Sequence, residues 1–390
     1  MIEHVENPGA ESFSPAEKIG ELLAEQFKKN PYFYFFSPDE TTSNRFNAVF
    51  DVEKRAWGDL SKETWDLPAG PDGRIIELLS ENTLFSVMAG HLINGEQAMM
   101  GSYEAFYPVI TSQILQHIKF MKQSREIEWR DEMPAVNLLS TSTCWRQDHN
   151  GFTHQSPALI STLLTLPTNL CNCLFPVDDV AAEVAFEFML ASRDVVNLTT
   201  FNKVELPRYI DSRHAKFQFE NGGASVYQFA SDDNPDFVLT AAGDIQTTET
   251  LEAMKILRKD LPGIRLKFVG ITALSYRAIG TTRNKLTKSQ FEEMFTADKP
   301  IIASFHGYPE TLAAIFENYT ARGRVRVHGY NEEGSTTTPF EMLRRNAASR
   351  YDIAADIAKV LGRTKLVEKY YNLLNENHAT AVKFGEDLIK

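Results

Sequence analysis

Residues 135–155 read AVNLLSTSTCWRQDHNGFTHQ, and this stretch decides the fold. Its apolar beginning (135–139) predicts a buried strand of a parallel sheet. The polar segment 145–155 follows, with His149 and His154 on either side of Gly151. Because open α/β sheets bind ligands just beyond the carboxyl ends of their strands, this segment is a candidate site. A hydrogen-bonded surface loop is the alternative interpretation, since loops are polar whether or not they carry function.

The composition restricts the class of protein. The chain has 390 residues, of which 43% are hydrophobic and 24% charged, as in soluble globular proteins of two or three domains. A net charge of -12 argues against nucleic acid or an anionic membrane as the main partner. Three cysteines form neither a disulfide framework nor a four-ligand zinc site, so we expect a cytoplasmic protein. We find no apolar run of membrane-spanning length and no secretory signal pattern.

Strand and helix signals alternate along the chain, which predicts two doubly wound α/β domains in series. Ser14-Pro15 predicts the start of a helix that ends near residue 30. Residues 39–45 predict the start of another helix, because acidic residues favour helix N-termini. We place a tail and helix at 1–30, one α/β domain at 31–215 and a second at 216–390. Buried strands are expected at 32–36, 74–79, 135–140, 171–175, 195–199, 237–241, 264–271, 300–305 and 324–327.

Two acidic positions are candidates for chemistry. Glu81 follows the apolar segment 74–79 and has apolar neighbours, where an unpaired carboxylate has a raised pKa. An ordinary acid in a first helical turn is the alternative. The pair Tyr103-Glu104 begins another predicted helix, and the pattern alone favours a capping and packing role there over a functional one.

A scattered set of polar side chains has the chemistry of a phosphate site, because guanidinium and ammonium groups bind phosphate well. Spacing alone does not bring its members together, and each is alternatively a solvated surface residue. A metal site at His149 and His154 lacks helical spacing and a cysteine partner, so we expect no metal ligands in this chain. The members of the phosphate set are Ser43, Arg125, His149, His154 and Lys203.

Taken together, the motifs resemble the thiamine-diphosphate-dependent phosphoketolases. The matching segments occur in family order from about residue 35 to about residue 362. They are FSPDETTSNRFNA (36–48), RIIELLSEN (74–82), GSYEAF (101–106), SREIEWR (124–130), WRQDHNGFTHQSP (145–157), DKPIIASFHGYPE (298–310) and GYNEEGSTTTPFEMLRRNAASRYDIAADI (329–357).

The resemblance implies a pyrimidine-binding domain with a parallel sheet, followed by a C-terminal domain with a mixed sheet. The family's diphosphate-binding domain, which carries the Mg²⁺ ligands, has no counterpart in this sequence. The chain is therefore expected to bind thiamine diphosphate together with a partner chain that supplies the diphosphate half and the Mg²⁺ site. Symmetry in the superfamily suggests a hetero-oligomer with two copies of each chain.

The resemblance also implies roles for individual residues. Glu81 matches the glutamate that hydrogen-bonds the aminopyrimidine ring, and Tyr103 matches a tyrosine at that ring. Other matches line the cleft (Asp39, Glu40 and Ser43), surround the substrate phosphate and the reacting two-carbon unit (Arg125, Asn150, His154 and Lys203) or lie beside them (Gln147 and His149).

The implied reaction cleaves a ketose phosphate and releases its two-carbon unit as acetyl phosphate. Three departures from the family pattern remove basic side chains: Asn82, Gly95-Glu96-Gln97-Ala98 and Thr143. They favour a second hypothesis, a transketolase-like subunit that passes the two-carbon unit to another acceptor. A third hypothesis is a non-catalytic regulatory or binding subunit.

Overall fold

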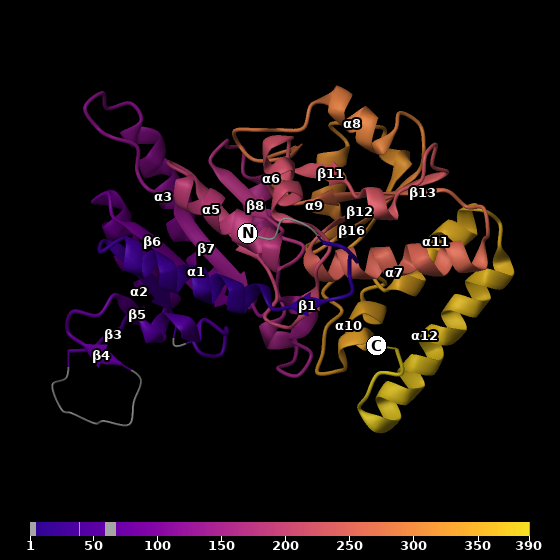
Figure 1. Ribbon diagram of the computed structural model, residues 1–390, viewed down its shortest axis with the longest axis horizontal. Helices are drawn as coiled ribbons and strands as arrows, with labels where there is room; N and C mark the ends of the chain where they lie inside the picture. Colours follow the sequence, from indigo (N-terminus) through magenta and orange to yellow (C-terminus); the bar gives the residue numbers. More distant parts are fainter. Residues whose placement is uncertain (1–4, 39, 59–67, 390) are drawn as a thin grey trace. The chain divides into compact units, whose positions relative to one another are not determined.

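The computed structural model describes residues 5–38, 40–58 and 68–389 (Figure 1). The chain divides into two compact units. Unit 1 consists of residues 1–142 and 168–215, and unit 2 of residues 143–167 and 216–390. Among the described residues, no helix is long and apolar enough to cross a membrane.

Unit 1 is built on a sheet whose strands lie in the order β8-β9-β7-β6-β2-β5-β3-β4, with every neighbouring pair parallel. The order changes direction at β2, because β5 lies on one side of it and β6 on the other. Such a switch point is where open sheets place ligands. The strands are β2 (Phe33–Ser37), β3 (Arg55–Ala56), β4 (Ala69–Gly70), β5 (Ile75–Glu77), β6 (Gln97–Tyr103), β7 (Val136–Thr141), β8 (Cys171–Leu174) and β9 (Val196–Thr200).

Helices provide the rest of unit 1. α1 (Pro15–Lys29) begins at Ser14, whose side chain accepts the Glu17 amide, and its apolar face is buried. It packs against the 3₁₀ helix at Asn47–Asp51 and against α5. The other elements are α2 (Glu81–Ile93), the 3₁₀ helix Glu104–Ile110, α3 (Thr111–Ser124), α5 (Asp179–Ala191) and a two-stranded ladder of β1 (Ser12–Phe13) with β10 (Leu206–Pro207).

Three buried asparagines cross the centre of this sheet. Asn172, Asn197 and Asn137 occupy matching positions on β8, β9 and β7. The Asn172 amide donates to Asn197 (2.8 Å), the Asn197 amide donates to Asn137 (2.8 Å), and the Asn137 amide donates to the Met189 carbonyl (3.2 Å). All three are nearly fully buried, so their pairing satisfies polar groups that would otherwise be costly to bury. We call this set the asparagine ladder.

Unit 2 contains a mixed sheet in the order β11-β13-β12-β16-β17, in which only β11 is antiparallel. The order changes direction at β12, between β13 and β16. The strands are β11 (Ala224–Val226), β12 (Phe237–Ala242), β13 (Leu266–Ile271), β16 (Ile301–Phe305) and β17 (Val325–His328), with short strands β14 (Ala273–Ser275) and β15 (Ala278–Ile279) beside them in sequence.

The helices of unit 2 include a C-terminal pair, α11 and α12, which pack closely along each other and which Figure 1 shows in yellow. α11 also packs on α7. The helices are α4 (Ala158–Thr165), α6 (Ser212–Glu220, which begins in unit 1), α7 (Asp244–Asp260), α8 (Lys288–Phe295), α9 (Pro309–Phe316), α10 (Pro339–Arg345), α11 (Arg350–Val360) and α12 (Thr364–Phe384).

The structure confirms the predicted fold class and corrects three details. Residues 40–45 form a turn and not the predicted helix. The helix at 15–29 is part of unit 1, whereas the predicted boundaries set it apart. Segment 143–167, which was placed in the first domain, belongs to unit 2, because its packing partners lie there.

Candidate active site

Several polar residues of unit 1 meet at the carboxyl edge of its sheet, beside the switch point. Glu40 lies in the turn after β2, and one carboxylate oxygen accepts the Tyr103 amide at the end of β6 (3.1 Å). The Ser43 hydroxyl donates to the Glu40 carbonyl and accepts the Tyr103 hydroxyl, both at 3.1 Å. The turn is closed by the Glu40 amide, which donates to Ser37 (3.2 Å). The structure thus brings together three residues that the sequence only suggested.

Glu40 and Glu81 form an interacting pair of carboxyl groups. Burial raises the pKa of Glu40 to about 7, the Tyr103 amide opposes this shift, and the negative charge of Glu81 adds to it. Glu81 is the first residue of α2, behind the cap Ser80, whose hydroxyl accepts the Thr83 amide. The pair therefore combines a carboxyl group that holds a proton near neutral pH with a second, half-buried carboxyl group within electrostatic range.

Lys203 and two aromatic rings lie at the same edge. The Lys203 ammonium is 4.8 Å from the centre of the Tyr103 ring, and its charge lowers the pKa of Glu40. The Tyr103 and Phe106 rings are stacked, 6.0 Å apart and 7° from parallel. Lys203 follows β9, whereas Tyr103 ends β6, so the fold brings them together across the intervening strand β7. The edge therefore offers a cation that can bind an anionic group, and a flat apolar surface.

Sequence reasoning missed Arg45 and Asn44, which belong to the same turn. Asn44 is fully buried, and its side-chain oxygen accepts hydrogen bonds from Thr141 and Ser142 at the end of β7. Arg45 has a positive φ of 63°, which is uncommon for a residue with a side chain, and it forms an ion pair with Glu17. The positive φ of Arg45 marks a strained backbone beside the polar edge, but this signal exists only in the structure and not in the sequence.

Arg125 does not lie with this group, and its assignment to the phosphate site stays a prediction. Its guanidinium donates to the carboxylate (3.2 Å) and the carbonyl (2.9 Å) of Asp194. Asp194 immediately precedes β9 and also accepts the Met133 amide ahead of β7 (3.0 Å). Arg125 therefore lies at the amino edge of the sheet, opposite the edge that holds Glu40, because it follows α3 and precedes the next strand.

The remaining residues of the first domain that the sequence analysis named are Asp39 and two departures from the family pattern. Asp39 lies outside the described residues. The segment 95–98 spans the end of the turn after α2 and the beginning of β6, where Glu96 forms a pair with His91. The departure at 95–98 is thus at the amino edge of the sheet and does not alter the charge of the carboxyl edge. The departure at Asn82, in contrast, lies in the first turn of α2 next to Glu81.

In unit 2, Trp145 anchors segment 143–155. It is fully buried, its indole N–H donates to the His306 carbonyl (2.8 Å), and its ring meets Tyr330 edge-on at 5.7 Å. The His306 amide in turn donates to Ala242 at the end of β12 (2.9 Å). The segment is therefore fixed at the carboxyl edge of the unit 2 sheet, next to its switch point.

Gln147 organises the polar residues that follow Trp145. Its side-chain oxygen accepts the Asn150 amide (2.6 Å), and its carbonyl accepts the Gln155 amide (2.9 Å). Gln147 is fully buried, yet among the described residues its side-chain nitrogen finds no partner. Buried donors are almost always satisfied, so this nitrogen could form one more hydrogen bond than the contacts of the described residues provide.

The two histidines of the segment differ in their surroundings. His149 is exposed, as is Asn150. His154 is half-buried, and its ring nitrogen Nδ1 lies 2.9 Å from the Thr153 hydroxyl. Gly151 has φ 76° and ψ -175°, a conformation that favours glycine, and it lets the chain reverse between them.

The GSTTTPF segment (334–340) braces this loop within unit 2. The Thr337 amide donates to the Asp148 carbonyl (3.1 Å), and Gln155 donates to the Ser335 carbonyl (3.1 Å). A Cβ atom at Gly334 would lie 1.8 Å from the Gln155 side-chain oxygen, so any larger residue there would displace the Gln155 side chain. Two of the longest motifs of the sequence are therefore parts of one rigid assembly, which we call the braced loop (145–155 with 334–340).

Comparisons with known proteins identify relatives that match nearly the whole length of the chain. A family model for D-xylulose 5-phosphate/D-fructose 6-phosphate phosphoketolase matches residues 17–192, and the XFP C-terminal domain matches residues 203–390. A probable phosphoketolase of Rhodopseudomonas palustris is 34% identical over 98% of this chain and 50% of its own length. One of Streptomyces avermitilis is 35% identical over 90% of this chain and 45% of its own length. The chain thus spans about half the length of these relatives.

Solved structures show the same fold at low identity. A transketolase of Leishmania mexicana matches with a TM-score of 0.66 and 14% identity, over 93% of this chain and 47% of that one. A split-gene transketolase, described as an inactive β4 tetramer, matches with a TM-score of 0.62 and 16% identity, over 90% of this chain and 99% of that one. Both family models and the curated relatives give one assignment: this chain belongs to the phosphoketolase family.

Proposed function

We propose that the chain is a subunit of a thiamine-diphosphate-dependent, phosphoketolase-like lyase that cleaves a ketose phosphate and releases the two-carbon unit as acetyl phosphate. The observation that carries the proposal is the pair Glu40 and Glu81 at the switch point of the unit 1 sheet. A carboxyl group with a pKa of about 7 beside a second carboxylate suits proton transfer at neutral pH.

The residues of unit 1 fit the pyrimidine end of the cofactor. Glu81 would share a proton with a nitrogen of the ring, and the stacked rings of Tyr103 and Phe106 offer the ring a flat surface. When bound, thiamine diphosphate supplies the carbon nucleophile and stores the electrons released on cleavage. Glu40 would hold a proton at its carboxyl oxygen and exchange it with Glu81 or with bound water.

Substrate recognition is assigned to the remaining polar residues. Lys203 and Ser43 at the unit 1 edge would bind the phosphate of the sugar, with Arg45 as a further cation on the same turn. Gln147, Asn150, His149 and His154 of the braced loop would orient the hydroxyl groups of the two-carbon unit, and His154 would donate the proton that dehydration requires. The unpartnered nitrogen of Gln147 supports such a contact.

A partner chain is part of the proposal. The chain spans half the length of its curated relatives and has the extent of the split-gene transketolase chain. Three large apolar side chains remain exposed on or just before helix α2: Leu79 (81%), Val87 (43%) and Ile93 (41%). Exposed apolar side chains of this kind suit a contact with a chain that carries the diphosphate-binding domain and the Mg²⁺ ligands. A hetero-oligomer with two copies of each chain is the expected assembly.

Reconstitution tests the proposal. The chain is combined with a diphosphate-domain chain, thiamine diphosphate, Mg²⁺ and a ketose phosphate, and acetyl phosphate is measured by its conversion to a hydroxamate. We expect acetyl phosphate from the complete mixture and a loss of at least about a hundredfold in Glu81→Gln, the typical range for a proton-transfer residue. The exposed Glu128→Gln is the matched control. Complete assembly without any cleavage would favour a regulatory subunit and refute the lyase.

The second candidate is a transketolase-like transferase. Asn82, next to Glu81 in the first turn of α2, supports it, because the family commonly has a basic residue there. The same mixture with an added aldehyde separates the two: a ketol product without acetyl phosphate identifies a transferase.

A further inference from the structure

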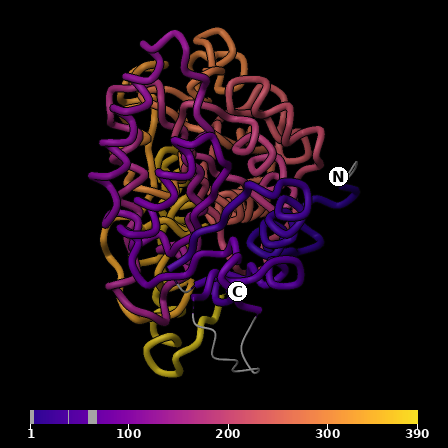
Figure 2. Tube along the Cα trace, turned by 90° about the vertical axis from the view of Figure 1, so that its left-hand side faces the viewer, coloured from indigo at the N-terminus to yellow at the C-terminus, as the bar shows by residue number. Residues whose placement is uncertain are grey.

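The segment after α12 folds back onto unit 2. α12 is capped by Gly385, whose φ of 71° reverses the chain (Figures 1 and 2), and Figure 1 shows the following residues returning toward α10. The side-chain oxygen of Asn377, which is fully buried in α12, accepts the Leu388 amide (2.9 Å) and the Ile389 amide (3.0 Å). The returning segment is therefore fastened to its own helix, and we call residues 385–389 the strap.

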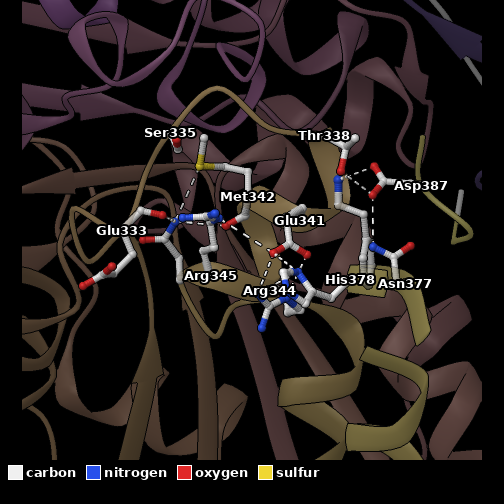
Figure 3. A network of polar contacts seen from close by, with 12 residues as sticks. Glu333, Ser335, Thr338, Glu341, Met342, Arg344, Arg345, Asn377, His378 and Asp387 are labelled. Carbon is white, nitrogen blue, oxygen red and sulfur yellow. Dashed lines mark hydrogen bonds and ion pairs between the residues drawn. The ribbon is translucent and has the colours of Figure 1, made fainter. Parts of the chain in front are cut away.

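Asp387 connects the strap to the start of α10. One carboxylate oxygen accepts the Thr338 hydroxyl (2.6 Å) and the Asn377 amide (3.0 Å), and the other accepts the Phe340 amide (2.7 Å). Figure 3 shows Asp387 between Thr338 and Asn377. Thr338 precedes the helix and makes no cap hydrogen bond of its own, so Asp387 supplies the acceptor that a capping side chain would otherwise provide.

The contact continues into the braced loop. Thr338 is adjacent to Thr337, whose amide holds the Asp148 carbonyl, and it lies three residues after Ser335, whose carbonyl holds Gln155. Asp387 also acts on the loop through its charge, since it contributes to the electrostatic surroundings of Arg146 and Asp148. Hydrogen bonds and charge therefore both link the strap to the segment that carries Gln147 and His154.

We infer that Asp387 is a positioning residue: through Thr338 and the Phe340 amide it holds the braced loop in the geometry that the substrate requires. The inference deepens the proposed function and rests on it for its catalytic part. No residue of the strap touches the reacting atoms in this assignment. Its effect passes through the backbone of residues 334–340. Weakening the contacts of the strap therefore increases the mobility of the braced loop more than the mobility of the rest of unit 2.

Hydrogen exchange of the complete chain, followed by mass spectrometry, tests the structural part without activity. In Asp387→Asn, an NH₂ group replaces one carboxylate oxygen. This group faces the Thr338, Asn377 or Phe340 donors and cannot accept from them, so at least one hydrogen bond is lost. We expect exchange at least about tenfold faster in peptides that cover 334–340 and 145–155, with β7 and β12 peptides unchanged. The neighbouring exposed residue provides the control Glu386→Gln, which removes the same charge and should leave all peptides unchanged.

Two outcomes would overturn the inference. Faster exchange confined to 338–342 would make Asp387 a helix cap only, and faster exchange throughout unit 2 would make it a general stability residue. In the reconstituted enzyme we expect Asp387→Asn to lower kcat about tenfold with little change in the KM for the sugar phosphate, and Asp387→Glu to recover part of it. If wild-type enzyme gives no turnover, the proposed function fails while the exchange result still decides the role of the strap.

Discussion

Replacing Glu40 by glutamine isolates the energetic effect of burying this carboxyl group. Its pKa is about 7 in the folded chain, against the ordinary 4.5. Folding therefore favours the protonated form, and stability falls as pH rises from the unfolded pKa to the folded one. Integrating the proton linkage between about pH 5 and about pH 8 gives a loss of roughly 2.5 kcal/mol in the free energy of unfolding, which Glu40→Gln does not suffer.

Urea unfolding of both proteins at these two pH values measures the effect. We expect Glu40→Gln to gain about 2.5 kcal/mol relative to the wild type on going from the lower to the higher pH, because glutamine has no charge to bury. The exposed Glu128→Gln should show no such trend. Glu81→Gln should reduce the trend, since the charge of Glu81 contributes to the shift. A difference between Glu40→Gln and wild type that is the same at both pH values would refute the reasoning.

Three further changes test the packing described above. Asn197→Ala removes the middle of the asparagine ladder and leaves two buried amides without their partner, so we expect a loss of about 2–4 kcal/mol in urea unfolding. Gly334→Ala should destabilise the braced loop by about 1–3 kcal/mol, because the new methyl group overlaps Gln155, and limited proteolysis should show faster cleavage there than in Gly323→Ala, where space is open. Trp145→Phe leaves a buried carbonyl without its donor and should cost about 1–3 kcal/mol, measured by the same unfolding assay.

Continuous apolar runs made most strands predictable. The strands at 33–37, 136–141 and 301–305 are largely buried, as helices on both sides of a sheet require, and apolar residues predominate in each of them. β6 escaped notice because its sequence, QAMMGSY, combines methionines with a glycine and has little of the β-branched character of a strand. Its neighbours β2 and β7 determine its conformation, and sequence alone does not contain that information.

The turn at 40–45 shows why local signals also failed. Its acidic and hydroxyl residues are common at helix starts, but here Ser37 and Ser43 bond to the backbone of Glu40. Such side-chain bonds compete with helix formation. The resemblance to a family suggested roles for Glu81 and Tyr103, which stay predictions, and it gave no means of placing Arg125, whose bond to Asp194 depends on the folded sheet.

Long-range contacts explain the rest. Segment 143–155 belongs to unit 2 because Trp145 reaches a carbonyl 161 residues away, and no periodicity in the sequence reports that bond. No local sequence pattern predicts the contacts of Asp387 either, because they join the start of helix α10 to a residue 47 positions later in the chain.

The asparagine ladder has a consequence for the alignment of the unit 1 edge. In a uniformly apolar parallel sheet, sliding one strand by a residue changes little in the burial of its side chains. Here a slip of one residue, about 3.3 Å, would turn the amide of that strand away from its neighbours and leave polar atoms in an apolar layer. β7 and β9 are thereby held at one relative height, and so are the turns that follow them, which carry Ser142 and Lys203. The asparagine ladder in the middle of the sheet thus fixes the register of β7 and β9, and with it the relative positions of the turns at the carboxyl edge.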